Sequence, residues 1–203
     1  MNRLWLIPVI AYALGSIPFG LLIVKATKGS DVRKSGSGNI GAANVSRVGG
    51  LGAGALTLLL DAAKGYLAVW LAARWSGGSV RWLAVAAVCA VLGHMFSVWL
   101  KFRGGKGVAT SFGAFIPICG KAVIAAAVLW LVVVIFWRYV SLGSIAAAAA
   151  MPILVYLLYA PGHAPASILS AGTMFIALMV IWKHRENIQR LMNGTENRIA
   201  RKR

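Results

Sequence analysis

Three polar segments of the chain carry the residue types that bind phosphate groups. The first, SGSGNIGAANVSR from Ser35 to Arg47, places glycines among serines and asparagines. Glycines let backbone N–H groups approach an anion closely, and the neighbouring hydroxyl and amide groups add further donors. The same composition is also typical of a flexible linker. The segment therefore fits two interpretations, an oxyanion site and a linker.

The second segment, FRGGKG, places Lys106 after Gly104 and Gly105 and directly before an apolar run. The unpaired N–H groups and the dipole at the start of a helix favour an anion at this position. The pattern resembles half of a phosphate loop but lacks the full Walker spacing. The alternative is that the basic residues of this loop only set membrane topology.

The third segment is the tail sequence KHRENIQRLMNGTENR, which predicts a helix leaving an apolar run. His184 and Asn187 are three residues apart and share a helix face, which can meet a phosphate. The alternative is an ordinary solvated helix end. Glu186 and Glu196 are expected to pair with Arg190 or Arg198, in a structural role.

The composition shows which elements must position these segments. The chain has 203 residues, 60% of them hydrophobic, and a mean hydropathy of +0.78. Its apolar residues form long runs, and a helix needs ~20 such residues to cross a bilayer. The alternating pattern of a membrane β-barrel is missing. We therefore expect an all-α polytopic membrane protein with a single domain, 1–203.

The formal charge of +17 comes from 21 Lys and Arg against 4 Asp and Glu. The basic residues flank the apolar runs, as the positive-inside rule expects, and no soluble part is available for nucleic acid. The three phosphate-type segments are the most basic, so this rule predicts that all three are cytoplasmic. We read the charge as topology together with anion binding.

An even number of crossings must separate these cytoplasmic segments, which predicts seven transmembrane helices, some short, with an external N-terminus and a cytoplasmic C-terminus. The least certain predicted span is Val108 to Cys119, because a helix of this length is only ~18 Å long. It is either supported by neighbouring helices or re-entrant, and five full crossings are the alternative. The predicted spans are Leu4 to Val24, Leu51 to Ala73, Trp82 to Leu100, Val108 to Cys119, Ala122 to Trp137, Ser141 to Ala160 and Ala166 to Trp182.

A few reactive side chains lie inside the apolar runs. Asp61 and Lys64 are three residues apart, and because ionisable groups in a membrane are costly, we expect a salt bridge or contact with the polar site. His94 ends a run and is expected to be a hydrogen-bonded structural residue. Cys89 and Cys119 lack metal-ligand spacing and are expected to be buried thiols.

Taken together, five motifs resemble the bacterial acyl-phosphate:glycerol-3-phosphate acyltransferases. The likeness covers nearly the whole chain, with two departures: Ala43 stands where the family usually has Thr, and Ser97 where it usually has Pro. The motifs are LGSIPFG from Leu14, SGSGNIGAANVSR from Ser35, LDAAKG from Leu60, GHMFSVWLKFRGGKGVAT from Gly93 and HRENIQRLMNGTE from His184.

The resemblance implies transfer of a fatty acyl group from acyl phosphate to the 1-hydroxyl of glycerol 3-phosphate. The products would be lysophosphatidic acid and phosphate, in the first step of phospholipid synthesis. The protein would lie in the bacterial inner membrane with its active site on the cytoplasmic face. Its partners would be the two substrates and the lipid bilayer, and no metal, other cofactor, coenzyme A or nucleic acid is implied.

The resemblance also assigns roles to residues. The proton acceptor for the hydroxyl is either the phosphate of the donor or His184, because no H-x4-D arrangement follows His94, His163 or His184. The residues expected to be catalytic are Lys106, His184 and Ser37, and those expected to bind substrate are Gly38, Asn39, Gly41, Asn44, Arg47, Gly104, Gly105 and Asn187.

The sequence lacks the features expected for three other functions. A transporter of phosphate or organic anions would be indicated by inverted repeats, and the sequence shows none. A CDP-alcohol phosphotransferase would need clustered aspartates for metal, which four scattered acidic residues do not supply. A purely structural subunit would leave the polar loops unexplained.

Overall fold

The computed structural model describes residues 3–159 and 167–199. Helices account for all the regular structure of these residues, so the all-α prediction is confirmed. They form two compact units, Met1–Ile118 and Cys119–Arg203, which are described separately; the single domain stays a prediction. His163 lies outside the described residues, as do two predicted span ends, Ala160 and Ala166.

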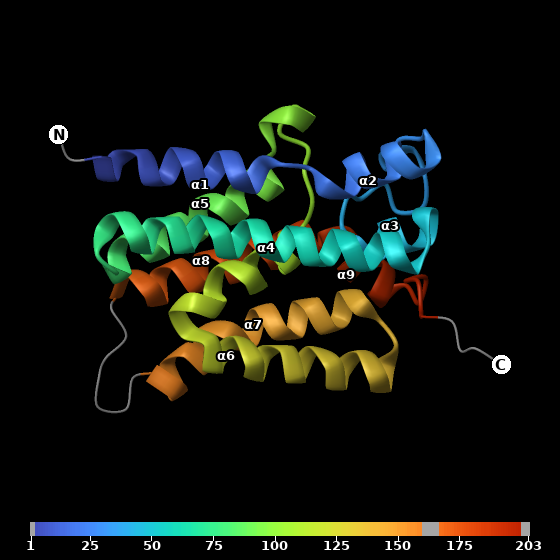
Figure 1. Ribbon diagram of the computed structural model, residues 1–203. Helices are drawn as coiled ribbons and strands as arrows, with labels where there is room; N and C mark the ends of the chain where they lie inside the picture. The colour runs from blue at the N-terminus through green and yellow to red at the C-terminus, as the bar shows by residue number, and fades with distance from the viewer. Residues whose placement is uncertain (1–2, 160–166, 200–203) are drawn as a thin grey trace. The chain divides into compact units, whose positions relative to one another are not determined.

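Unit 1 is built around α1, α4 and α5, with α1 packed against both of the others (Figure 1). The chain leaves α1 at Ile17 because Pro18 lacks an N–H and restricts the residue before it. The α-helices of this unit are α1 (Leu6–Ser16), α2 (Phe19–Lys28), α3 (Ala42–Gly49), α4 (Leu51–Ser76), α5 (Val80–Met95) and the first part of α6 (Val108–Trp137).

Glycines allow the helices of unit 1 to pack closely. A Cβ on Gly15 of α1 would lie 2.0 Å from the carbonyl oxygen of Ala90 on α5. One on Gly113 of α6 would lie 1.9 Å from the carbonyl oxygen of Ala62 on α4. Small residues at such crossings are how membrane helices gain packing contacts. These crossings fix the helix ends that carry the two polar loops.

The polar stretch between the predicted spans Leu4 to Val24 and Leu51 to Ala73 is more helical than a loop. Helix α2 continues to Lys28, and Ala42–Gly49 forms α3, with a short 3-10 helix at Val32–Lys34 between them. The loop itself, called the first loop below, is therefore residues 29–41. The second loop is residues 96–107, with a 3-10 helix at Val98–Leu100.

Unit 2 contains the rest of α6, together with α7 (Val140–Tyr159), α8 (Ser167–Lys183) and α9 (Arg185–Met192). Helix α7 packs against α8. A bend of 55° separates α8 from α9. After α9 the chain returns to the turn between α6 and α7, where Ile199 N–H donates to the carbonyl of Arg138 at 2.9 Å.

Seven spans are not confirmed. Among the described residues, five helices or helix pairs are long and apolar enough to cross a membrane, and α8 with α9 would make a sixth. The difference arises in α6, which runs from Val108 to Trp137 where two spans were expected, because Gly120 and Lys121 are helical. Its interruption is the non-helical Cys119 (φ −142°, ψ 54°), where the short span was predicted to end.

Candidate functional site

The first loop is organised by the side chain of Asn44, which lies on α3 and is buried. Its Nδ2 lies 3.2, 3.1 and 2.9 Å from the carbonyl oxygens of Val32, Ser35 and Asn39. Its Oδ1 accepts a hydrogen bond from the N–H of Ser37 at 2.8 Å. Because the side-chain amide forms hydrogen bonds with the loop's own backbone, Asn44 stabilises the conformation of the loop.

Other N–H groups of the first loop are also used internally. The N–H of Gly38 donates to the carbonyl of Ser35 at 3.1 Å, and that of Gly41 donates to Asn39 Oδ1 at 2.8 Å. Gly38 has φ +69°, a conformation that glycine adopts without strain. The loop is thus a turn held by its own hydrogen bonds, unlike a flexible linker, and it presents exposed side chains to an anion.

Two exposed side chains of this region suit a phosphate. Ser37 lies at the loop surface, and Arg47 lies on the last turn of α3 without a carboxylate partner among the described residues. Arg33 differs, because its Nη2 lies 2.6 Å from Asp31 Oδ2. The hydrogen bond from Arg33 lowers the pKa of Asp31 to about 2. Arg47 is therefore the arginine here that is available to a ligand.

The two glycines of the second loop pack against the end of α5. The N–H of Gly104 donates to the carbonyl of Met95 at 3.2 Å, and that of Gly105 donates to the carbonyl of His94 at 3.0 Å. A Cβ on Gly104 would lie 2.0 Å from the His94 oxygen, and one on Gly105 would lie 2.2 Å from His94 Nε2. Close packing thus explains both glycines, which were expected to bind substrate.

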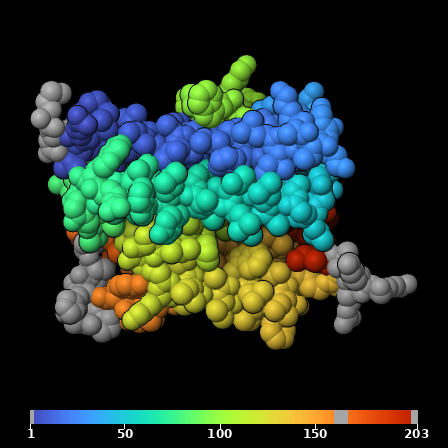
Figure 2. Space-filling view, in the orientation of Figure 1, coloured from blue at the N-terminus to red at the C-terminus, as the bar shows by residue number. Residues whose placement is uncertain are grey.

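Lys106 follows directly and stands two residues before α6, as the sequence predicted. Its side chain is half-buried, whereas Phe102 in the same loop is exposed. The tip of this loop protrudes beyond α1 and α2 (Figure 2). Gly107 (φ +81°) turns the chain into the helix. The loop therefore places one cation beside a helix start, the arrangement that favours an anion.

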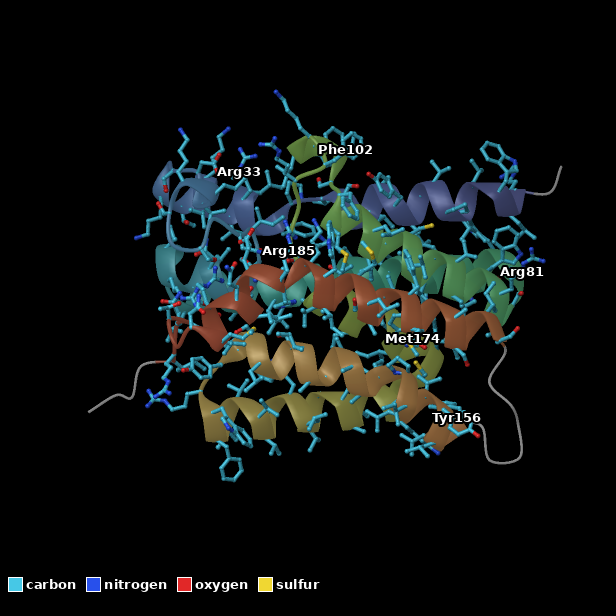
Figure 3. All side chains as sticks on the ribbon, turned by 180° about the vertical axis from the view of Figure 1, so that it is seen from behind. Arg33, Arg81, Phe102, Tyr156, Met174 and Arg185 are labelled. Carbon is cyan, nitrogen blue, oxygen red and sulfur yellow. The ribbon has the colours of Figure 1, made fainter. Side chains whose placement is uncertain are left out.

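The two loops share an apolar core. Leu100 of the second loop is buried with Val32 and Ile40 of the first loop, together with Val24 of α2 and Val45 of α3. Figure 3 shows Arg33 and Phe102, one from each loop, on the same side of unit 1, with Arg81 at the far end of α5. The shared core therefore places the two basic loops next to each other in unit 1, and their membrane side stays a prediction.

A buried polar cluster lies behind the second loop. Lys64 Nζ is 2.8 Å from Asp61 Oδ1, 3.0 Å from His94 Nδ1 and 2.7 Å from the carbonyl oxygen of Ile17. All three side chains are buried. The predicted salt bridge and the structural, hydrogen-bonded His94 are confirmed. Sequence spacing gave no sign that His94 and Ile17 join the pair, because they lie far from it in the sequence, His94 on α5 and Ile17 just after α1.

The remaining predicted residues lie in unit 2. His184 is buried at the bend between α8 and α9, and its Nδ1 donates to the carbonyl of Val180 at 2.8 Å. Asn187 Nδ2 donates to Glu196 Oε1 at 2.7 Å. Arg190 Nε donates to Glu196 Oε2 at 2.7 Å. Asn187 was expected to bind substrate, and the structure shows it contacting the chain's own carboxylate.

Glu196 ties the end of the chain to α7 and α9. Besides the two contacts just described, Ser141 Oγ on α7 donates to its Oε1 at 2.8 Å, a contact that sequence analysis missed. Burial raises the pKa of Glu196, but the hydrogen bonds from Arg190, Asn187 and Ser141 outweigh it and hold this pKa below its usual value. The structural role predicted for Glu196 is confirmed, whereas Glu186 makes only a surface contact with Arg185.

Comparison with known proteins gives a consistent result. The family described as glycerol-3-phosphate acyltransferase matches residues 5–194. A glycerol-3-phosphate acyltransferase of Syntrophotalea carbinolica is 48% identical over 198 residues, which cover 98% of both chains. One from Geotalea daltonii is 49% identical over 187 residues, covering 92% of this chain and 93% of that one. The sequence likeness is thus nearly end to end.

Solved structures extend the likeness to the fold. The integral membrane glycerol 3-phosphate acyltransferase PlsY, in its glycerol 3-phosphate form, superposes with a TM-score of 0.89 at 36% identity and covers 98% of this chain and 96% of that one. The lysophosphatidic acid form of PlsY gives a TM-score of 0.87 at 33% identity, with the same coverage. Sequence and fold therefore point to the same proteins.

Proposed function

The chain belongs to the glycerol-3-phosphate acyltransferase family, and on this basis we propose that its acyl donor is an acyl phosphate and its product lysophosphatidic acid. The observation that carries the proposal is the fold shared with PlsY, whose two solved forms are a glycerol 3-phosphate form and a lysophosphatidic acid form. An acceptor and its acylated product on one fold are what such a transfer needs. The acyl-phosphate donor rests on the five motifs given above.

The proposed reaction is an acyl transfer. The 1-hydroxyl oxygen of glycerol 3-phosphate attacks the acyl carbonyl carbon, and the bond from that carbon to the phosphate oxygen breaks. Inorganic phosphate leaves with the electron pair, and the hydroxyl proton is taken up by the leaving phosphate or by His184. Lys106 neutralises the negative charge that develops on the leaving group.

The geometry refines which groups hold the phosphates in this proposal. In this proposal the side chains of Ser37, Arg47 and Lys106 make the contacts: Ser37 is exposed on the first loop, Arg47 is exposed on α3, and Lys106 stands just before the start of α6. Gly38, Asn39 and Gly41, with Asn44, Gly104 and Gly105, keep these side chains in place. The substrate site is thus held by cations and a hydroxyl on a preorganised backbone.

The proton acceptor remains a choice between two groups. The carbonyl of Val180 can only accept, so Nδ1 of His184 carries a proton and Nε2 is the basic nitrogen of the neutral ring. We favour the donor's phosphate as the proton acceptor, because it is bonded to the acyl carbon that the hydroxyl attacks. Loss of turnover in His184→Ala with donor binding intact would instead favour His184 as the base. The role of Asn187 as a substrate ligand stays a proposal.

We place the protein in the bacterial inner membrane, with both loops and the C-terminal tail on the cytoplasmic side and the N-terminus outside. Seven crossings follow if the break at Cys119 divides α6 into two spans. Cysteines at exposed positions test this in intact cells: an impermeant maleimide should label Gly77→Cys, between α4 and α5, but not Ser37→Cys. The opposite labelling would reverse the orientation.

The deciding experiment uses protein purified in detergent, palmitoyl phosphate and glycerol 3-phosphate, without metal or coenzyme A. Phosphate release that depends on glycerol 3-phosphate is expected, and palmitoyl-coenzyme A should not replace the donor. Lys106→Ala should lose most of this activity, whereas Lys101→Ala, an exposed cation of the same loop, should keep it. Absence of dependent phosphate release in folded protein would refute the acyl-phosphate donor, and uptake of phosphate by proteoliposomes would favour the transporter.

A further inference from the structure

The cluster of Asp61, Lys64 and His94 joins three separate parts of unit 1. Asp61 and Lys64 are one turn apart on α4, His94 ends α5, and the carbonyl of Ile17 lies at the break between α1 and α2. Each side chain of the cluster is at most 4% exposed. An ion pair kept at such depth is costly unless fully partnered, and removing it in favour of apolar groups is often neutral for stability. Its presence therefore calls for another reason.

The contacts of Lys64 and Asp61 fix the orientation of the His94 ring. Lys64 Nζ donates to the carbonyl of Ile17 at 2.7 Å, lies 3.0 Å from His94 Nδ1 and forms an ion pair with Asp61 Oδ1 at 2.8 Å. His94 Nδ1 also lies 3.6 Å from Asp61 Oδ1, so the same ring nitrogen faces both charged groups of the pair. These contacts hold the ring in one orientation.

That orientation has a direct consequence for the second loop. Nε2 of His94 lies where a side chain at Gly105 would begin, only 2.2 Å from the position of its Cβ, and the His94 carbonyl accepts from the Gly105 N–H. The ring and the backbone of His94 therefore both contact the residue before Lys106. Through Lys64 the same ring is tied to Ile17, from which the chain continues through α2 to the first loop.

We propose that Asp61, Lys64 and His94 form a positioning cluster that fixes Lys106 relative to the break between α1 and α2, without touching substrate. This inference rests on the proposed role of Lys106. The apolar core around Leu100 holds the two loops together, whereas the polar cluster sets where the short segment from Gly104 to Lys106 lies. Hydrogen bonds and ion pairs are directional and can fix the position of this segment, whereas apolar packing is non-directional.

The first test replaces the whole pair, Asp61→Leu with Lys64→Met, so that no uncompensated charge is left in the interior. The matched control is Thr57→Val, a buried position one turn earlier on α4 whose hydroxyl bonds only within its own helix, to Ala53. Both proteins should elute as folded species. The pair variant should lose at least roughly tenfold in kcat with a smaller change in KM, the pattern of a weakened transition-state contact, and the control should keep wild-type values.

A second test uses the contact between ring and glycine. Gly105→Ala should lose kcat because its Cβ meets the ring, and His94→Ala should lose it because the ring is gone. The double variant should recover part of the activity, since the new methyl group occupies the space left by Nε2. Additive losses in this double-mutant cycle would overturn the proposed contact.

A third measurement does not depend on the reaction. Lys106→Cys in a background of Cys89→Ala and Cys119→Ala places a half-buried thiol at the site, and its rate of maleimide labelling reports the position of the segment. The rate should rise roughly threefold or more when the pair variant is combined with this thiol, and stay unchanged with Thr57→Val. An unchanged rate in the folded pair variant would overturn the proposal. If wild type is inactive with acyl phosphate while the labelling rates shift as expected, only the donor assignment fails.

Discussion

Replacement of Asn44 should loosen the first loop before any substrate is present. The side chain donates to loop carbonyls and accepts from Ser37 N–H, in a buried position. It has two donors and at least one acceptor in use, and each such bond contributes about 1 kcal/mol net, so Asn44→Ala should cost ~3 kcal/mol. Asn44→Asp should cost more, because it turns a carboxylate oxygen toward carbonyl oxygens. Asn39→Ala, which removes a single bond to Gly41, should cost ~1 kcal/mol.

The assay is limited trypsin digestion without substrate, combined with thermal unfolding in detergent. Arg33 and Lys34 are exposed in the loop, and cleavage there should be slow in wild type, faster in Asn39→Ala and fastest in the two Asn44 variants. The KM for glycerol 3-phosphate should rise in the same order. If instead Asn44→Ala raised this KM while the rate of cleavage and the melting temperature stayed at wild-type values, Asn44 would be a substrate ligand and the structural reasoning would be refuted.

Two further predictions concern stability. The pKa of Glu196 in the folded protein lies below its usual value, so its contribution to stability is present above the unfolded pKa of about 4.3 and is lost as the pH falls through the folded pKa. The melting temperature should therefore fall more steeply below pH ~4.5 in wild type than in Glu196→Gln. Parallel curves for the two proteins would contradict this prediction. Gly113→Ala should lower the melting temperature sharply because its Cβ meets the backbone of α4, whereas Gly52→Ala, which meets nothing within 4 Å, should leave it unchanged or raise it; equal melting temperatures would show that the α4–α6 crossing can widen.

The sequence predicted well those features that depend on local pattern. Apolar runs gave the helices, glycine and serine composition gave the loops, and the three-residue spacing of Asp61 and Lys64 gave their ion pair. It predicted poorly what depends on long-range contact. Nothing near His94 indicates that Lys64 binds its ring, and nothing in the first loop shows that Asn44 contacts several carbonyls at once. The predicted division of α6 coincides with its non-helical residue, Cys119, whereas the number of spans stays a prediction.

The glycines of the second loop show why composition alone leaves the role of such a loop open. Glycine is favoured where a backbone N–H must reach an anion, and also where one chain segment must lie directly against another. At Gly104 and Gly105 the structure selects the second reason, since both N–H groups donate to the end of α5 and both Cα atoms face His94. In the segment Gly104 to Lys106, an anion would then be bound by the side chain of Lys106. This is why a variant at position 105 should reduce kcat by displacing Lys106, and why loss of the His94 ring should partly restore it.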